Sequence, residues 1–104
     1  MKKIRIELTD KDGKTNIYEQ KNIPLKKMLE WYQIEDAIQK GEIKPGIEIL
    51  EQKIKFVADL FDDERVTYEA ILEGLDAREF EQSIQQLILK AMGIELENDE
   101  EGKE

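Results

Sequence analysis

The sequence contains no cysteine and no histidine among its 104 residues. Without cysteine there can be no disulfide, no thiolate metal site and no cysteine nucleophile. Without histidine, the chain lacks the usual general base near neutral pH and the commonest ligand of transition metals. Other residues would have to fill these roles, and carboxylates are abundant. Their densest cluster (Asp59, Asp62, Asp63, Glu64) lacks the alternating ligands and central glycine of a calcium loop. We expect no catalytic, cofactor-binding or metal site.

Long apolar runs are also missing. No stretch approaches the roughly 18 apolar residues that a membrane span needs, and no signal-peptide pattern opens the chain. The sequence therefore predicts a cytoplasmic protein without a membrane partner.

Positive charge is scarce, because 25 acidic side chains outnumber 16 basic ones and give a net charge of −9. The imbalance grows along the chain, from +2 over residues 1–46 to −6 over residues 47–94 and −5 over residues 95–104. Binding to a phosphate backbone needs clustered Lys and Arg, so we expect no nucleic-acid partner. The acidic segment 95–104 is expected to be a disordered tail.

A β-hairpin is predicted at the N-terminus. Ile4, Ile6 and Leu8 alternate with charged residues, which gives a strand one apolar and one polar face. The segment 10–13, which ends in Asp-Gly, supplies a turn, and residues 15–21 can return as the second strand. A lone hairpin is marginal in water, so it must pack on helices or pair its edge with another chain.

A first helix is predicted to start with Pro24 in its first turn, to run to about Gln39 and to end at Gly41. Its apolar stripe is wider than one side of a small core needs. Leu25, Met28, Leu29 and Tyr32 form one face, and Trp31, Ile34 and Ile38 continue around the helix. Part of this stripe, above all Trp31 and Tyr32, is a candidate partner surface, although a single Trp is also a common core residue.

Three more helices are predicted after the loop 41–46. The helix 47–61 carries a seam of apolar residues and a second row beside it, which are Ile47, Leu50, Ile54, Val57, Phe61 and Ile49, Phe56, Leu60. Thr67 can cap the next helix, and Gly74 near its end can adopt the left-handed conformation. Asp76 and Glu79 fit a capping box for the last helix, whose stripe is Phe80, Ile84, Leu87, Ile88 and Ala91.

These elements predict an α+β fold that is mostly α, in which an N-terminal β-hairpin packs on a small bundle of about four helices. We expect one globular domain over residues 1–94, divided into the hairpin (1–22) and the helical part (24–93), followed by the acidic tail.

The second half of the chain resembles the small tail assembly chaperones of long-tailed bacteriophages and prophages, chiefly those of Gram-positive bacteria. The resemblance lies in the order of signals: a helix ending in Leu60 and Phe61, a polar break, a start at Val66 and Thr67, a corner at 74–77 and a last helix. It extends more weakly back to Ile23 and covers about two-thirds of the chain.

The resemblance implies a non-enzymatic protein that coats the tape measure protein in the bacterial cytoplasm, helps to gather tail tube subunits and is absent from the mature virion. Self-association is compatible with the generous apolar stripes, although the core could absorb them all. The alternative is an acidic helical interaction module, or a nucleic-acid mimic that inhibits a basic protein. The candidate partner-binding residues are Trp31 and Tyr32, with Ile17, Tyr18 and Glu19 on the second strand.

Overall fold

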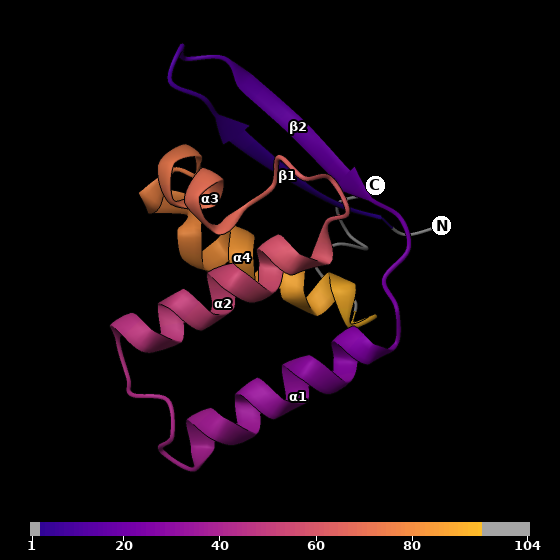
Figure 1. The fold of residues 1–104 in the computed structure, drawn as a ribbon, viewed down its shortest axis with the longest axis vertical. Coiled ribbons are helices and arrows are strands. Elements are labelled where there is room, and N and C mark those ends of the chain that lie inside the picture. Colours follow the sequence, from indigo (N-terminus) through magenta and orange to yellow (C-terminus); the bar gives the residue numbers. More distant parts are fainter. Residues whose placement is uncertain (1–2, 95–104) are drawn as a thin grey trace, which may run out of the picture.

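A computed structural model describes residues 3–94, and the predicted tail 95–104 lies outside the described residues. A β-hairpin precedes four helices and one short 3₁₀ turn, which confirms the predicted α+β, mostly α fold (Figure 1). The elements are β1 (Ile4–Thr9), β2 (Thr15–Gln20), α1 (Lys26–Gln39), α2 (Ile47–Leu60), α3 (Tyr68–Gly74), η1 (Ala77–Glu79) and α4 (Phe80–Ala91). None of the helices within residues 3–94 has the length and apolar composition that crossing a bilayer requires.

The hairpin forms because an alternating apolar pattern is joined by a turn that Asp10 organises. Its carboxylate accepts hydrogen bonds from the backbone N–H groups of Asp12 and Lys14. The strands pair antiparallel from Ile4 opposite Gln20 to Thr9 opposite Thr15. The side chains that β1 turns toward the helices, those of Ile4, Ile6 and Leu8, are buried as predicted.

Helices α1 and α2 form an antiparallel pair. The ring of Trp31 packs at 5.2 Å from that of Phe56, measured between ring centroids. Gly41 has a φ of +79° just after α1, which is the left-handed conformation predicted for the end of this helix. Three of the five residues of the predicted α2 seam are buried, whereas Ile47 and Leu50 at its N-terminal end are exposed. The expectation that the whole seam packs on other helices is therefore wrong at its N-terminal end.

Local capping signals delimit the last three elements. The hydroxyl of Thr67 accepts a hydrogen bond from the backbone N–H of Ala70, as predicted. Asp76 also caps, but its carboxylate accepts from the backbone N–H of Arg78 at the start of η1. The reciprocal Glu79 contact of a capping box is not among the hydrogen bonds of residues 3–94, because a 3₁₀ turn precedes α4 at this corner.

The expectation that Gly74 adopts the left-handed conformation is also wrong, because its φ is not positive. It is instead needed for close packing. A Cβ atom at this position would lie 2.9 Å from the Cβ atom of Leu8 and 3.0 Å from the carbonyl oxygen of Thr9. The end of α3 thus approaches β1 more closely than any side chain would permit.

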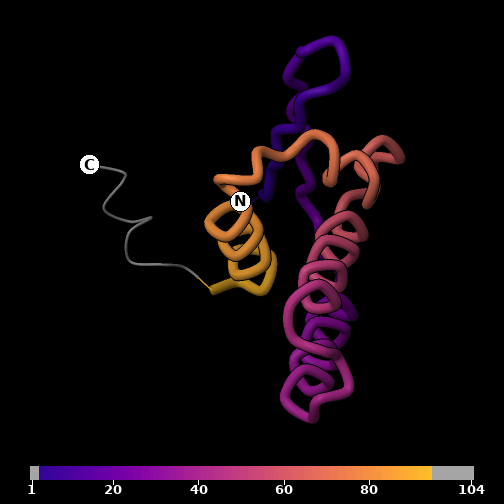
Figure 2. The backbone as a smooth tube through the Cα atoms, turned by 90° about the vertical axis from the view of Figure 1, so that its left-hand side faces the viewer, coloured from indigo at the N-terminus to yellow at the C-terminus, as the bar shows by residue number. Residues whose placement is uncertain are grey.

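The core lies where β1, α3 and α4 meet the C-terminal half of α2. Figure 2 shows α1 and α2 in one column and α4 beside it, and α4 packs against α2. Helix α1 makes its main contacts with α2. The fully enclosed side chains are Val57, Ile71, Ile84 and Ile88, and around them the hairpin and the helices share a single hydrophobic cluster.

Candidate functional site

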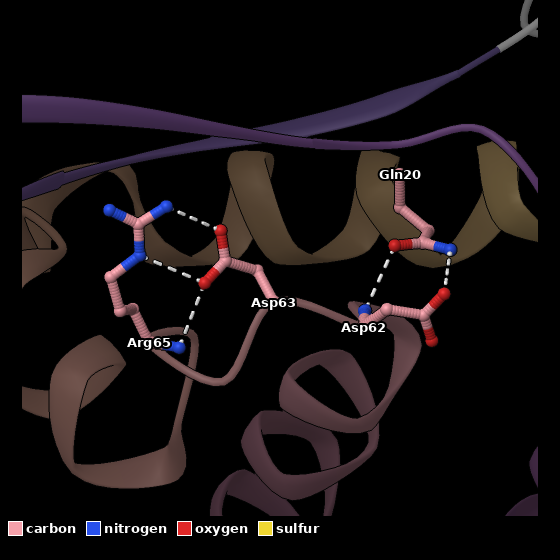
Figure 3. Close-up of polar contacts among 4 residues, drawn as sticks. All are labelled: Gln20, Asp62, Asp63 and Arg65. Atoms are coloured by element: carbon pink, nitrogen blue, oxygen red, sulfur yellow. Dashed lines mark hydrogen bonds and ion pairs between the residues drawn. The ribbon is translucent and has the colours of Figure 1, made fainter.

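The acidic cluster that follows α2 has a structural role. The Gln20 side chain amide donates a hydrogen bond to the Asp62 carboxylate (3.1 Å), and its carbonyl oxygen accepts one from the backbone N–H of Asp62 (2.9 Å; Figure 3). This Gln20–Asp62 clasp fixes the end of β2 to the α2–α3 loop. Among residues 3–94, no group of His, Cys, Asp and Glu side chains is arranged to hold a metal ion.

Beside the clasp, Arg65 folds back on Asp63. The guanidinium donates to both carboxylate oxygens, at 3.0 and 2.8 Å, and the backbone N–H of Arg65 adds a third bond (Figure 3). These hydrogen bonds lower the pKa of Asp63 from 3.8 to about 2. Asp76 is held in the same way by Arg78, and its pKa is also lowered to about 2. Both carboxylates stabilise turns and stay charged at neutral pH, so neither is poised for proton transfer.

The strongest candidate for a binding surface is an exposed apolar row on α1. The exposed fractions of Leu25, Leu29 and Tyr32 are 74, 61 and 56%. These residues are spaced by four and three positions, so they form one ridge along the helix. The face that packs on α2 is centred on Trp31, which is 6% exposed.

Helical geometry orients this row. Tyr32 lies about 100° around the helix from Trp31. This rotation turns Tyr32 away from the face that packs on α2, in agreement with its exposure. On α2, Ile47 and Leu50 continue the buried stripe of that helix beyond the core into solvent. We call the set of Leu25, Leu29, Tyr32, Ile47 and Leu50 the α1–α2 apolar face.

The predicted site residues lie in two separate places. Trp31 is in the core and Tyr32 is on the α1–α2 apolar face. The hairpin candidates are on β2, at the other end of the molecule from α1 (Figure 1). Ile17 and Glu19 are on its outer face, whereas the Tyr18 ring is half-buried and lies under the Arg65 guanidinium, 5.2 Å from the ring centroid. The structure therefore does not bring the two groups together.

Sequence reasoning missed Leu25, Leu29, Ile47 and Leu50 as surface residues. It placed them in apolar stripes, and periodicity alone does not show which part of a wide stripe is buried. The available signal was the excess width of the apolar stripe on α1. It indicated that some of the stripe is exposed, but not which residues.

The geometry describes a small helical protein with structural carboxylates and a sizeable apolar surface. Across residues 1–104, the chain matches the model of a family described as phage tail chaperone protein. Neither a curated protein nor a solved structure matches it. Because the family match spans the whole sequence, this chain belongs to the phage tail chaperone protein family.

Proposed function

We propose that this tail chaperone binds the tape measure protein and helps to recruit tail tube subunits during tail assembly. It acts without enzymatic activity in the cytoplasm of the bacterial host and is left out of the mature virion. The observation that carries the proposal is the α1–α2 apolar face, where α1 leaves three large apolar side chains in solvent. Large apolar side chains exposed along one side of a helix mark interaction sites on soluble proteins.

The shape of the face suits a helical client. The row of Leu25, Leu29 and Tyr32 follows one side of α1, so an amphipathic helix can pack along it. Ile47 and Leu50 add exposed apolar surface on α2. Trp31 supports the face from below, because its packing on Phe56 holds α1 against α2. Ile17, Tyr18 and Glu19 on β2 are a second proposed contact, since the outer edge of this strand can pair with an extended segment.

Co-expression with the tape measure protein encoded by the same phage or prophage tests the proposal. We expect the wild-type chain to keep the tape measure protein soluble and to co-purify with it. The double variant L29Q/Y32A should lose most of this binding while its thermal unfolding changes little. Leu72 offers a control, because it is a half-exposed leucine on another helix, α3, and L72Q should bind like the wild type.

The variant Trp31→Ala distinguishes a loss of stability from a loss of a direct binding contact. Truncation of this buried ring should cost about 3–5 kcal/mol of stability, so its binding defect should come with a lower melting temperature. The proposal is overturned if the tape measure protein stays insoluble beside the wild-type chain. The α1–α2 apolar face is excluded as the site if L29Q/Y32A binds as well as L72Q.

A further inference from the structure

Helix α1 belongs to a segment that apolar packing, rather than hydrogen bonding, joins to the rest of the molecule. The segment covers residues 24–43, and we call it the α1 arm. At its end, the backbone N–H groups of Glu42 and Ile43 donate to the Ala37 carbonyl, back into the arm. None of the hydrogen bonds found among residues 3–94 links the arm to another part of the chain.

The contacts that hold the arm are centred on one side chain. Helix α1 lies at one edge of the molecule, beside α2 (Figure 1). Its one buried residue is Trp31, which packs on Phe56. The one ion pair to α2 joins the Lys27 ammonium to the Asp59 carboxylate at 3.7 Å. Because the Asp59 side chain is 76% exposed, this ion pair contributes little to stability.

A hollow of about 390 Å³ lies between α1 and α2. Its apolar lining includes Ile34 and Ala37 of α1, Ile43 of the following loop and Phe56 of α2. The packing of the arm on α2 is therefore incomplete, and apolar groups of both helices are accessible to the side chains of a partner.

The charges at the start of α1 oppose helix formation. A helix is stabilised by acidic residues in its first turn and by basic residues in its last turn. Helices α2, α3 and α4 have an acid in the first turn, which is Glu48, Glu69 and Glu81 respectively. Helix α1 instead begins with Lys26 and Lys27, and no basic residue lies in its last turn. The arm is therefore weak as a helix as well as weakly attached.

Both ends of the arm can act as hinges. Before the arm, the Asn22 carbonyl accepts a hydrogen bond from the Gln20 side chain and so belongs to the hairpin. After the arm, Ile43 is bonded to α1, whereas the N–H of the next residue, Lys44, donates to the Glu48 carboxylate on α2. Displacement of the arm thus breaks no hydrogen bond at either end.

Apolar side chains lie on opposite sides of α1. Leu29 is about 160° around the helix from Trp31, and it is exposed whereas Trp31 is buried. A helix that is apolar on all sides is normally covered on all sides. In this molecule only α2 covers it, so the arm has apolar surface for a partner on one face and gains more when it leaves α2.

We infer that the α1 arm opens away from α2, and that an amphipathic helix of the tape measure protein binds to the opened state between the arm and α2. The exposed row of Leu25, Leu29 and Tyr32 makes the first contact, and opening adds the inner faces around Trp31 and Phe56. This inference rests on the proposed function, because it describes the state of the same site that holds the client. A client that binds the open state better shifts the arm toward it.

A reversible cross-link tests whether opening is needed. The chain contains no cysteine, so Glu30→Cys and Asp59→Cys provide two unique thiols. Both positions line the hollow, one on each helix, and both carboxylates lie near the Lys27 ammonium, at 3.2 and 3.7 Å. A short bis-thiosulfonate reagent joins the two thiols through disulfide bonds, and a reductant releases them.

Aggregation of the tape measure protein, diluted from denaturant and followed by light scattering, measures client binding. The wild-type chain should suppress this aggregation. The locked variant should be needed at about tenfold or higher concentration for the same effect, because only the open fraction binds. Reductant should restore the activity, which shows that the variant is folded.

Two controls isolate the effect of the lock. The same double variant treated with a monofunctional thiosulfonate lacks both carboxylates but is not locked, and it should act like the wild type. Lys3→Cys with Glu19→Cys places an equivalent cross-link on the hairpin, where these side chains lie 3.1 Å apart. This cross-linked protein should also act like the wild type.

Amide hydrogen exchange measures opening without a client. An isolated helix of this length is marginal in water, so an opened arm exchanges its amide hydrogens. The lock should slow exchange in residues 26–39 by about tenfold or more, and reductant should reverse the change. Exchange in residues 80–91 of α4 should be the same in the locked and released proteins.

Three results overturn the inference. If the locked protein suppresses aggregation as well as the released protein, the client does not need the open state, and the proposed function still stands. If residues 26–39 exchange equally fast in both, the arm does not open by itself. If the wild-type chain fails to suppress aggregation, the proposed function fails, and the inference that rests on it fails as well.

Discussion

Gly74 shows how a single missing side chain can fix two elements against each other. Its Cα lies so close to β1 that the contact atoms belong to the backbone of Thr9 and the Cβ of Leu8. Backbone atoms and a Cβ cannot move aside as the tip of a long side chain can. The position is therefore restricted to glycine by packing rather than by its own dihedral angles.

We expect Gly74→Ala to destabilise the protein by about 1–3 kcal/mol, as overpacking typically does. Urea unfolding followed by circular dichroism measures the change. Glu73→Ala is the matched control, because Glu73 precedes Gly74 on α3 and is exposed. Equal stability of Gly74→Ala and Glu73→Ala would show that α3 can move away from β1 without cost.

Asp63 and Asp76 make stability depend on pH. Each has a folded pKa of about 2, below its ordinary value of 3.8. A depressed pKa means that the ionised form is favoured by folding, so its contribution is present above about pH 4 and is lost as pH falls toward 2.

The double variant D63N/D76N should therefore lose less stability than the wild type between pH 5 and pH 2. It should also be the less stable protein at pH 7, where the wild-type carboxylates are paired with Arg65 and Arg78. Thermal melts at pH 7, 5, 3 and 2 measure both effects. If the melting temperatures of the two proteins fell equally with decreasing pH, Asp63 and Asp76 would not be the source of the pH dependence.

At the scale of elements, the Gln20–Asp62 clasp connects two segments that are 42 residues apart in sequence. Gln20 is the only polar residue among the buried side chains of residues 3–94, and its amide has partners for both its oxygen and its nitrogen. A buried polar group with all its partners specifies one arrangement of the chain.

Gln20→Leu would leave the Asp62 N–H without its acceptor, at an expected cost of about 1–3 kcal/mol. Gln20→Glu should also destabilise, because a carboxylate would face that of Asp62 and could not donate to it. Chemical denaturation measures both variants. Asn16→Leu on the same face of β2 serves as control, because its side chain donates only a long bond, 3.4 Å, to Asp10.

The elements that sequence reasoning located correctly are those with local signals. The cap at Thr67, the glycine at 41 and the alternation of β1 each act within a few residues, and the structure confirms them. The errors concern Gly74 and Ile47, whose surroundings depend on segments far away in the chain. Which face of α1 is buried likewise depends on the position of α2. The sequence therefore predicted that part of this helix is a candidate binding surface, but it did not identify the exposed row of Leu25, Leu29 and Tyr32.

At the scale of the molecule, α1 is the least supported helix. Its main contacts are with α2, and Trp31 is its one buried residue. Helix α4, by contrast, buries Ile84, Leu87 and Ile88 against both α2 and β1. Local stability follows such differences in buried contacts.

Amide hydrogen exchange should therefore be faster in α1 than in α4 or in the C-terminal half of α2. We expect α1 to exchange through an opening that leaves the rest of the core protected. Mass spectrometry of peptides covering residues 26–39 and 80–91 measures the difference. Equal protection of the two helices would indicate that the protein opens only as a whole.

The position of β1 affects how the protein is made. This strand is synthesised before α3 and α4, the helices against which its three buried side chains pack. The side chains of Ile4, Ile6 and Leu8 therefore remain exposed on the nascent chain until residues 68–91 have left the ribosome. Contacts between such distant segments slow folding, so the nascent chain carries an unprotected apolar strand until α4 has been synthesised. A chaperone of this design is itself, for that interval, a chain with exposed apolar surface.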